Sequence, residues 1–240
     1  MPLKGKRVVV TGGASGIGRA TVELLRASEA NVVTVDIRDP GDDSQFIACD
    51  VSDGPSVAAM TISAVAILGG LDAVVNVAGI QRSGAVDVLE ESSWDDQMRI
   101  NVRSCFLTTK YAVAHLRQAG GGAIVTTSSL AGVKGFAGMT AYCASKGAVV
   151  AFTRALAVEL AHEKIRANCL CPGWVDTPFN DPVISFQGGT QAHAEIIASS
   201  VPLGREGLPP EMAHWLAFLI SDEASYMTGQ AINVDGGLSA

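Results

Sequence analysis

The sequence carries a phenol and an ammonium group four residues apart, in Tyr142-Cys143-Ala144-Ser145-Lys146. On a helix this spacing brings both side chains to one face. A phenol with a pKa near 10 is a poor base at neutral pH. A cation about 4 Å away, at an effective dielectric near 20, contributes roughly 4 kcal/mol and lowers that pKa by about three units. The pair therefore predicts a tyrosinate that acts as a general base near pH 7.

A hydroxyl-rich segment that contains Ser129 precedes this pair and follows an expected strand. Ser129 is interpreted either as a hydrogen-bond donor to a substrate oxygen or as an ordinary loop hydroxyl. Ligands of open α/β sheets bind beyond the carboxyl ends of the strands. Ser129, Gly12 and Asn76 all fall at such ends in the expected arrangement, and this convergence favours a common site.

Glycines crowd the segment Thr11–Gly18, which follows the first expected strand and opens the first expected helix. Gly12, Gly16 and Gly18 give the spacing Gly-x-x-x-Gly-x-Gly. Glycines let the backbone approach a pyrophosphate, and the helix N-terminus offers free N–H groups and about half a positive charge. The segment predicts a site for nucleotide phosphates, the alternative being a purely structural turn between strand and helix.

An acidic residue, Asp36, ends the second expected strand. A carboxylate there accepts hydrogen bonds from an adenosine ribose and repels a 2′-phosphate, which predicts NAD rather than NADP. Arg38 is a possible phosphate partner two residues on, but Ile37 and Ser15 place no base at the nearer positions. The alternative is that Asp36 merely begins a loop.

Asp50 and Val51 follow the third expected strand. Asp50 could hold the amino group of an adenine. A helix-capping role for the nearby Ser52 or Asp53 is an equally good interpretation of this segment.

Short β-branched runs without polar alternation predict strands that are covered on both faces, as in parallel sheets. They lie at Arg7–Val10, Asn31–Asp36, Leu71–Asn76, Ala123–Thr127, Arg166–Cys171 and Gln230–Val234, with a weaker run at Gln45–Ala48. Helical stretches alternate with them at 16–28, 53–67, 93–118, 139–162 and 209–221. This alternation predicts one α/β domain over residues 1–240, a doubly wound parallel sheet flanked by helices on both faces.

The longest stretch without an expected element is 173–204, which contains Pro178, Pro182, Gly188 and Gly189. Loops of this length within a compact domain usually have a function or are mobile. We expect a substrate lid here, rather than a merely variable surface loop. His193 in this segment is expected to be solvated rather than catalytic.

The expected helix over 139–162 is apolar on more than one face, because Ala144, Ala151, Phe152, Leu156 and Val158 cannot all point at one sheet. A helix that is apolar all round must be buried all round. We therefore expect its second face to meet another copy of the chain in a symmetric homodimer or homotetramer.

Composition limits the partners. The 17 basic and 24 acidic residues give a net charge of −7, which repels nucleic acid and anionic lipid surfaces. No uncharged apolar stretch has the roughly 18 residues that span a bilayer, and the N-terminal apolar run is too short for a secretory signal. The five cysteines are odd in number and scattered, which predicts a reducing, cytoplasmic location and no metal site.

The chain resembles the short-chain dehydrogenase/reductase family over essentially its whole length. The shared motifs are Thr11–Gly18, Asp36, Asn76-Val77-Ala78-Gly79, Asn101, Ser129, Tyr142-x-x-x-Lys146, Pro172-Gly173 with Thr177, Thr228-Gly229-Gln230 and Val234-Asp235-Gly236-Gly237. Val77 departs from the family, which more often has a second Asn there. Valine still permits the backbone turn under the adenosine ribose, so little effect is expected.

This resemblance implies a Rossmann-like sheet of seven strands in the order 3-2-1-4-5-6-7, and it assigns roles to the reacting group of residues. Tyr142 would be the general acid/base, and Lys146 would lower its pKa and hold the nicotinamide ribose. Ser129 would orient the substrate oxygen. Asn101 would anchor a water leading to Lys146, although without the resemblance it is interpreted as a surface or capping residue.

The resemblance also implies a set of residues that bind NAD. Pro172, Gly173 and Thr177 would position the nicotinamide. The whole expected set is Gly12, Ser15, Gly16, Ile17, Gly18, Asp36, Asp50, Val51, Asn76, Ala78, Gly79, Tyr142, Lys146, Pro172, Gly173, Val175 and Thr177.

Together these observations predict an NAD-dependent oxidoreductase that moves a hydride between a secondary alcohol or ketone and the nicotinamide. One alternative is a non-catalytic scaffold of this family that acts as a nucleotide sensor or interaction protein. The intact set of Ser129, Tyr142, Lys146 and Asn101 argues against it. A second alternative, a glycine-rich methyltransferase of related fold, would have no use for the Tyr–Lys pair.

The expected walls of the substrate pocket combine apolar rings with a few polar groups, which favours a modest cyclic or polyhydroxylated alcohol over a long acyl chain. They are Gln81, Arg82, Trp94, Val133, Lys134, Phe136, Trp174, Phe179 and the lid to about Gly204.

Overall fold

Seven parallel strands form one sheet in the order β3-β2-β1-β4-β5-β6-β7, which confirms the predicted topology. The computed structural model describes residues 2–240, so Met1, where the expected domain begins, lies outside the described residues. The strands are β1 (Arg7–Thr11), β2 (Asn31–Asp36), β3 (Phe46–Ala48), β4 (Ala73–Asn76), β5 (Gly122–Thr127), β6 (Ile165–Pro172) and β7 (Ala231–Val234).

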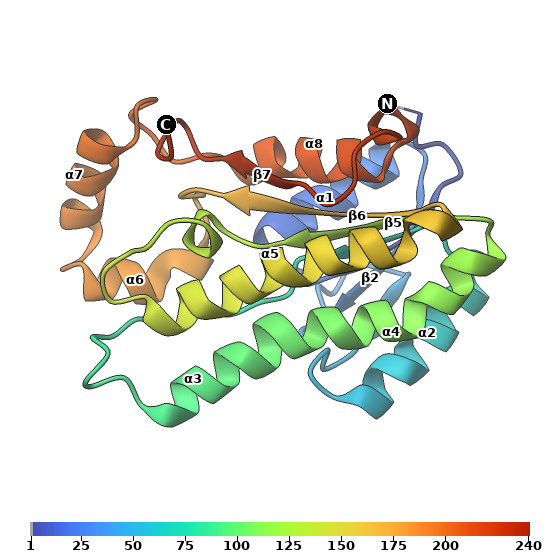
Figure 1. Ribbon diagram of the computed structural model, residues 1–240, viewed down its shortest axis with the longest axis horizontal. Coiled ribbons are helices and arrows are strands. Elements are labelled where there is room, and N and C mark those ends of the chain that lie inside the picture. The colour runs from blue at the N-terminus through green and yellow to red at the C-terminus, as the bar shows by residue number, and fades with distance from the viewer. Residues whose placement is uncertain (1) are drawn as a thin grey trace.

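Helices cover both faces of the sheet (Figure 1). One layer holds α1 (Gly16–Ala27) and α8 (Pro209–Ile220), and the other holds α2 (Gly54–Leu68), α4 (Ser104–Gln118) and α5 (Thr140–Leu160). Successive side chains of a strand point to opposite faces, so Val8 and Val10 join the core under α1 and α8 while Val9 joins the other. Every one of these valines is buried, which explains why the strand shows no polar alternation.

The helix expected over 93–118 is three segments in the structure. They are α3 (Glu91–Gln97), a π-helical turn η1 (Met98–Arg103) and α4. Single π-helical turns inside α-helices often occur at functional sites. This turn carries Asn101, whose side chain is buried.

The segment 173–204 is largely helical, so the prediction that it lacks elements is wrong. It contains η4 (Pro178–Asn180), α6 (Asp181–Phe186) and α7 (Thr190–Ser200). Pro178 and Pro182 stand in the first turns of η4 and α6, where a missing N–H breaks no helical hydrogen bond. Gly188 and Gly189, both at φ 101°, separate α6 from α7. The two prolines therefore start helices, and the two glycines form the connection between α6 and α7.

Three short 3-10 turns complete the described elements, η2 (Leu130–Gly132), η3 (Ala161–Glu163) and η5 (Asp222–Ala224). Within residues 2–240, no helix combines the length and the apolar character that crossing a bilayer requires.

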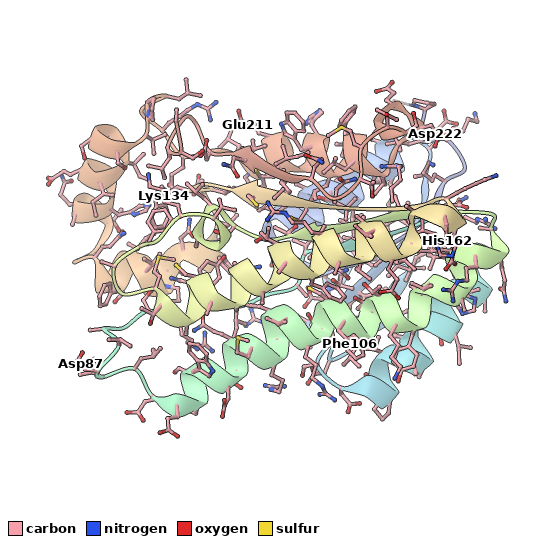
Figure 2. All side chains as sticks on the ribbon, in the orientation of Figure 1. Asp87, Phe106, Lys134, His162, Glu211 and Asp222 are labelled. Carbon is pink, nitrogen blue, oxygen red and sulfur yellow. The ribbon has the colours of Figure 1, made fainter. Side chains whose placement is uncertain are left out.

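The outward face of α5 is exposed in the single chain. Its exposed residues include Ala144, Ala151, Ala155 and Val158, the last with 83% of its surface accessible. Phe106 on the neighbouring α4 is 48% exposed and is visible on this side of the molecule (Figure 2). The chain itself therefore covers only one side of α5.

Candidate active site

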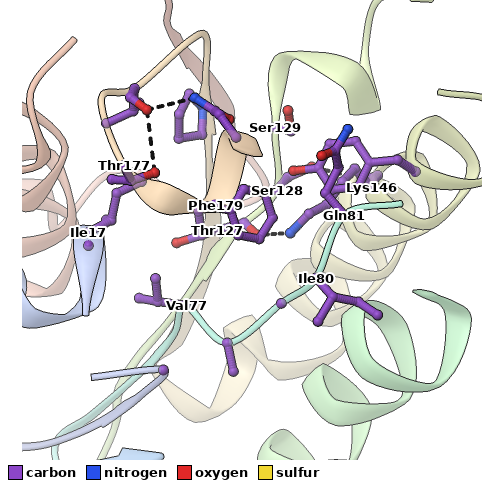
Figure 3. Close-up of a pocket in the computed structure, with 18 of the residues that line it drawn as sticks. Ile17, Val77, Ile80, Gln81, Thr127, Ser128, Ser129, Lys146, Thr177 and Phe179 are labelled. Carbon is purple, nitrogen blue, oxygen red and sulfur yellow. Dashed lines mark hydrogen bonds between the residues drawn. The ribbon is translucent and has the colours of Figure 1, made fainter. Parts of the chain in front are cut away.

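A cavity of about 530 Å³ opens at the carboxyl ends of the strands. It has the size of ordinary cofactor and substrate pockets. Figure 3 shows its wall, which is built from the ends of β4, β5 and β6 and the segments that follow them. Most of the predicted site residues line it: Gly12, Ser15, Gly16, Ile17, Asp36, Asp50, Val51, Ala78, Gly79, Ser129, Tyr142, Lys146, Pro172, Gly173, Val175 and Thr177.

The glycine turn fits a phosphate group. Gly12 has φ 69°, and a Cβ there would lie 2.6 Å from the Ala78 nitrogen, so only glycine allows these two segments to approach. Ser15 precedes α1 and makes no side-chain cap hydrogen bond, which leaves N–H groups of the first turn for a ligand. The glycine turn therefore lets a ligand approach the backbone closely and offers it free N–H groups at the positive end of α1, as a dinucleotide pyrophosphate requires.

Three predicted site residues do not line the cavity and support it from behind. A Cβ on Gly18 would lie 1.9 Å from the Gly12 oxygen, so Gly18 serves the shape of the turn. Asn76 accepts a hydrogen bond from Thr108 Oγ1 at 2.8 Å and thereby ties β4 to α4. Asn101, the third, is buried and joins the loop after β4 to α5.

The Asp36 carboxylate lies at the end of β2, beside the glycine turn. Its Oδ2 accepts a hydrogen bond from the Ala14 N–H at 3.1 Å, and its Oδ1 accepts one from the Arg38 N–H at 3.1 Å. These bonds hold the negative charge at the wall of the cavity. Ile37 is 70% exposed and lines the cavity beside this carboxylate.

Asp53, rather than Ser52, caps the helix after β3. The Asp53 carboxylate accepts a hydrogen bond from the Ser56 N–H at 2.9 Å at the start of α2. Asp50 instead accepts bonds from the hydroxyl and the N–H of Ser52 at 2.7 and 2.8 Å, which lower the pKa of the Asp50 carboxyl. Asp50 thus remains at the cavity wall as an anion.

Tyr142 and Ser129 meet within the cavity wall. Burial raises the pKa of the Tyr142 phenol above its usual value of 10, and its hydrogen bond with Ser129 lowers that pKa only in part. The prediction of a tyrosinate near pH 7 is therefore wrong for this structure, because the apolar surroundings disfavour a phenolate more than its neighbours stabilise one. At neutral pH the Tyr142 hydroxyl carries its proton.

Lys146 lies one helical turn along α5, with Nζ 5.7 Å from the centre of the Tyr142 ring. The ammonium donates a hydrogen bond to the Thr127 carbonyl oxygen at 2.9 Å (Figure 3). Burial lowers the pKa of Lys146. The Tyr142 phenol, the Ser129 hydroxyl and the Lys146 ammonium therefore share one wall of the cavity.

Asn101 joins the loop after β4 to α5. Its Oδ1 accepts from the Ile80 N–H at 2.8 Å, and its Nδ2 donates to the Ile80 oxygen at 2.9 Å and to Ser145 Oγ at 3.0 Å. Only 1% of its surface is exposed, so the interpretation of a surface asparagine is wrong. The side chain holds the site's framework in place.

Four of the predicted substrate walls line the cavity and four do not. Gln81, Phe136, Trp174 and Phe179 line it, whereas Arg82, Trp94, Val133 and Lys134 are absent from its wall. Trp94 and Val133 are exposed at 43% and 48%, and the Lys134 ammonium donates to the Leu238 oxygen at 2.7 Å.

The cavity wall also includes Met139 and Leu238, which the sequence reasoning missed, and Val183 from the expected lid. Val183 lies on α6, which the sequence reasoning did not expect as a helix. Leu238 comes from the end of the chain and gives no local signal of its place.

His193 is buried, so the expectation that it is solvated is wrong. Its Nδ1 and Nε2 lie 2.8 Å from Gln187 Oε1 and 3.1 Å from Glu206 Oε1. Its ring packs edge-on against Trp174 with 5.0 Å between ring centres. It joins α7 to the loop before α8 and stands outside the cavity wall.

A parallel sheet with a phosphate cradle and a Ser–Tyr–Lys group at one edge is the architecture of a nucleotide-dependent oxidoreductase. A family model described as enoyl-(acyl carrier protein) reductase matches residues 12–239, and the chain belongs to the short-chain dehydrogenase/reductase family. Members of this family are oxidoreductases that use the nicotinamide cofactors NAD(P) and act on a CH–OH group or its carbonyl counterpart.

The chain is similar to several known proteins over nearly its whole length. A 3-oxoacyl-[acyl-carrier-protein] reductase, FabG of Thermotoga maritima, is 36% identical and covers 99% of both chains. A 2,5-dichloro-2,5-cyclohexadiene-1,4-diol dehydrogenase of Sphingobium indicum is 39% identical over 99% of this chain and 98% of its own. The solved structure of Thermoplasma acidophilum aldohexose dehydrogenase has a TM-score of 0.92 at 31% identity, over 99% of this chain and 95% of its own.

Proposed function

We propose that this protein is an NAD-dependent dehydrogenase that interconverts a ring-bearing secondary alcohol and its ketone. The observation that carries the proposal is that Ser129, the buried Tyr142 hydroxyl and the Lys146 ammonium line one cavity together with the glycine turn. A scaffold that only bound a nucleotide would have no chemical need for this second group of residues.

In the proposed arrangement Gly12, Ser15, Gly16 and Ile17 hold the pyrophosphate, and Asp36 holds the adenosine ribose. Asp50 and Val51 flank the adenine, and Ala78 and Gly79 lie under the same half of the cofactor. Pro172, Gly173, Val175 and Thr177 surround the nicotinamide. When bound, NAD supplies the acceptor for a hydride.

The chain's own part in the reaction is to hold the substrate oxygen and to move its proton. Ser129 donates a hydrogen bond to that oxygen, and Tyr142 transfers the proton at its phenolic oxygen. In ketone reduction the protonated phenol is already in the required state at neutral pH, whereas alcohol oxidation needs the phenolate. Lys146 stabilises that phenolate, and Asn101 positions Ile80 and α5 around the pair.

The substrate class is proposed from the cavity wall. Phe136, Trp174 and Phe179 supply flat apolar surfaces, and Gln81 supplies a polar group. Such a wall fits a modest ring with more than one oxygen better than a long acyl chain. Two of the similar proteins are named for a cyclohexadiene diol and an aldohexose, which supports this class.

The direct test is NADH formation from NAD⁺ across cyclic alcohols and diols, polyols, sugars and hydroxy acids, with NADP⁺ in parallel. Reduction of a 3-oxoacyl thioester is the competing activity, since one relative carries that name. Turnover of the thioester with no turnover of any ring alcohol would overturn the proposal.

Asp36→Ser is expected to reduce the preference for NAD⁺ over NADP⁺ by about 10–100-fold in kcat/KM. The substitution removes the carboxylate that accepts from the ribose and repels a 2′-phosphate. Steady-state kinetics with both cofactors measure the ratio. Asp39→Ser, an exposed carboxylate three residues on, is the matched control and should leave the ratio unchanged. An unaltered preference in the Asp36 variant would contradict its assignment.

We also propose that the exposed stripe of α5 packs against a second copy of the chain, giving a dimer or a tetramer. Val158→Glu places a charge in the stripe and is expected to lower the molar mass measured by light scattering. Glu159→Gln, at the next position, is the control. If the native protein had the mass of a single chain, or if Val158→Glu kept the native oligomeric mass, the stripe would not be an interface between copies.

Residues 173–204 are proposed as a substrate lid, because Thr177, Pro178, Phe179, Asn180 and Val183 from this segment line the cavity. With it, residues 1–240 form one domain whose pocket is made from its own loops. A cytoplasmic location remains a prediction, supported by the five free cysteines.

A further inference from the structure

One polar side chain in the cavity wall has an atom with no partner. Gln81 is only 3% exposed and lines the same cavity as Ser129 and Tyr142. Its Nε2 donates a hydrogen bond to Ser83 Oγ at 2.7 Å. Its Oε1 is buried and has no hydrogen-bond partner among residues 2–240. Figure 3 shows Gln81 on the side of the cavity that carries Ser129 and Lys146.

The backbone around Gln81 is held on both sides. Asn101 binds both the N–H and the oxygen of Ile80, at 2.8 and 2.9 Å. On the other side the Arg82 N–H donates to Gln97 Oε1 at 3.0 Å, and Gln97 is fully buried. Ser83 binds the amide nitrogen of Gln81, so the carboxamide is held by one hydrogen bond on a backbone that Asn101 and Gln97 fix on both sides.

A buried amide oxygen without a partner is unfavourable, and native structures rarely keep one without a reason. Phe136 and Phe179, which line the same cavity, carry no hydrogen-bond donor. A ligand hydroxyl would satisfy it. Because a hydroxyl both donates and accepts, it would also satisfy the amide nitrogen if the carboxamide were turned over, with Ser83 Oγ then donating to the oxygen.

We propose that Gln81 binds a second hydroxyl group of the substrate, distinct from the one whose proton Tyr142 transfers. The preferred substrates are accordingly ring diols or polyols rather than ring monoalcohols. This inference rests on the proposed function, which supplies the position of the reacting oxygen.

The test compares cyclohexanol with the cis and trans 1,2-, 1,3- and 1,4-cyclohexanediols, using NAD⁺ and the whole chain. In the unmodified protein, kcat/KM for the best diol is expected to exceed that for cyclohexanol by about 10–100-fold. Gln81→Met keeps the length of the side chain and removes the amide. It is expected to lower kcat/KM for the diol by about 10-fold or more relative to cyclohexanol, chiefly through KM.

Ser83→Ala is the second variant and keeps Gln81 but removes its anchor. It is expected to reduce the diol preference by about 3–10-fold, and it carries the test if Gln81→Met does not fold. Equal losses on diol and cyclohexanol in both variants, or an unchanged preference, would overturn the role of Gln81. If the unmodified protein oxidised no ring alcohol at all, the proposed function itself would fail, which is a distinct result.

Discussion

Replacement of Tyr142 by phenylalanine is expected to lower turnover by about 10²–10⁴-fold while NADH binding is retained. Phenylalanine fills the same buried space, so only the hydroxyl is lost. That hydroxyl is the proposed partner for the proton of the substrate oxygen, and proton transfer of this kind contributes a factor of that size. Steady-state rates and NADH fluorescence titration measure the two quantities separately.

Tyr111→Phe on α4 is the matched control for this variant. Tyr111 is partly buried, whereas Tyr142 is buried, and it packs near Lys110 outside the cavity wall. It should keep both turnover and NADH binding. Near-normal turnover of Tyr142→Phe would show that another group moves the proton, and loss of NADH binding would show that the phenol mainly serves the cofactor.

Lys146→Met is expected to lower kcat/KM for alcohol oxidation by about 10²–10³-fold and to move its pH dependence upward. Burial already raises the pKa of Tyr142, and oxidation requires the phenolate, so the rate should rise with pH. The Lys146 ammonium near the ring favours the phenolate. Removing it raises the phenol pKa further, so the rising limb of the profile shifts to higher pH.

The pH profile separates this electrostatic role from a packing role. Methionine fills the buried stem of Lys146, although it leaves the Thr127 oxygen without the bond from Nζ. Lys110→Met, at the exposed face of α4, controls for the loss of one positive charge. A rate loss with an unshifted profile would mean that Lys146 positions the cofactor without tuning Tyr142.

The sheet could be predicted from the sequence because its signal is local. A strand that is covered on both faces needs consecutive apolar residues, and runs such as Asn31–Asp36 have no other good interpretation. The helices of segment 173–204 could not be predicted, because the local signals there fit two different structures. Pro182 and Gly188 are compatible with a loop and with a helix that starts or ends there, and only packing of Val183 and Ile197 into buried clusters selects the helices.

Residue spacing was enough to identify the glycine turn, the end of β2 at Asp36 and the Tyr142–Lys146 pair, because each depends on positions along one element. The tertiary structure alone decided the burial that raises the Tyr142 pKa, the partners of His193 and the unpaired oxygen of Gln81. Burial and hydrogen bonding depend on atoms contributed by distant segments. The free energy of a charged or polar group therefore follows from the packed fold, and the residue type gives only its starting value.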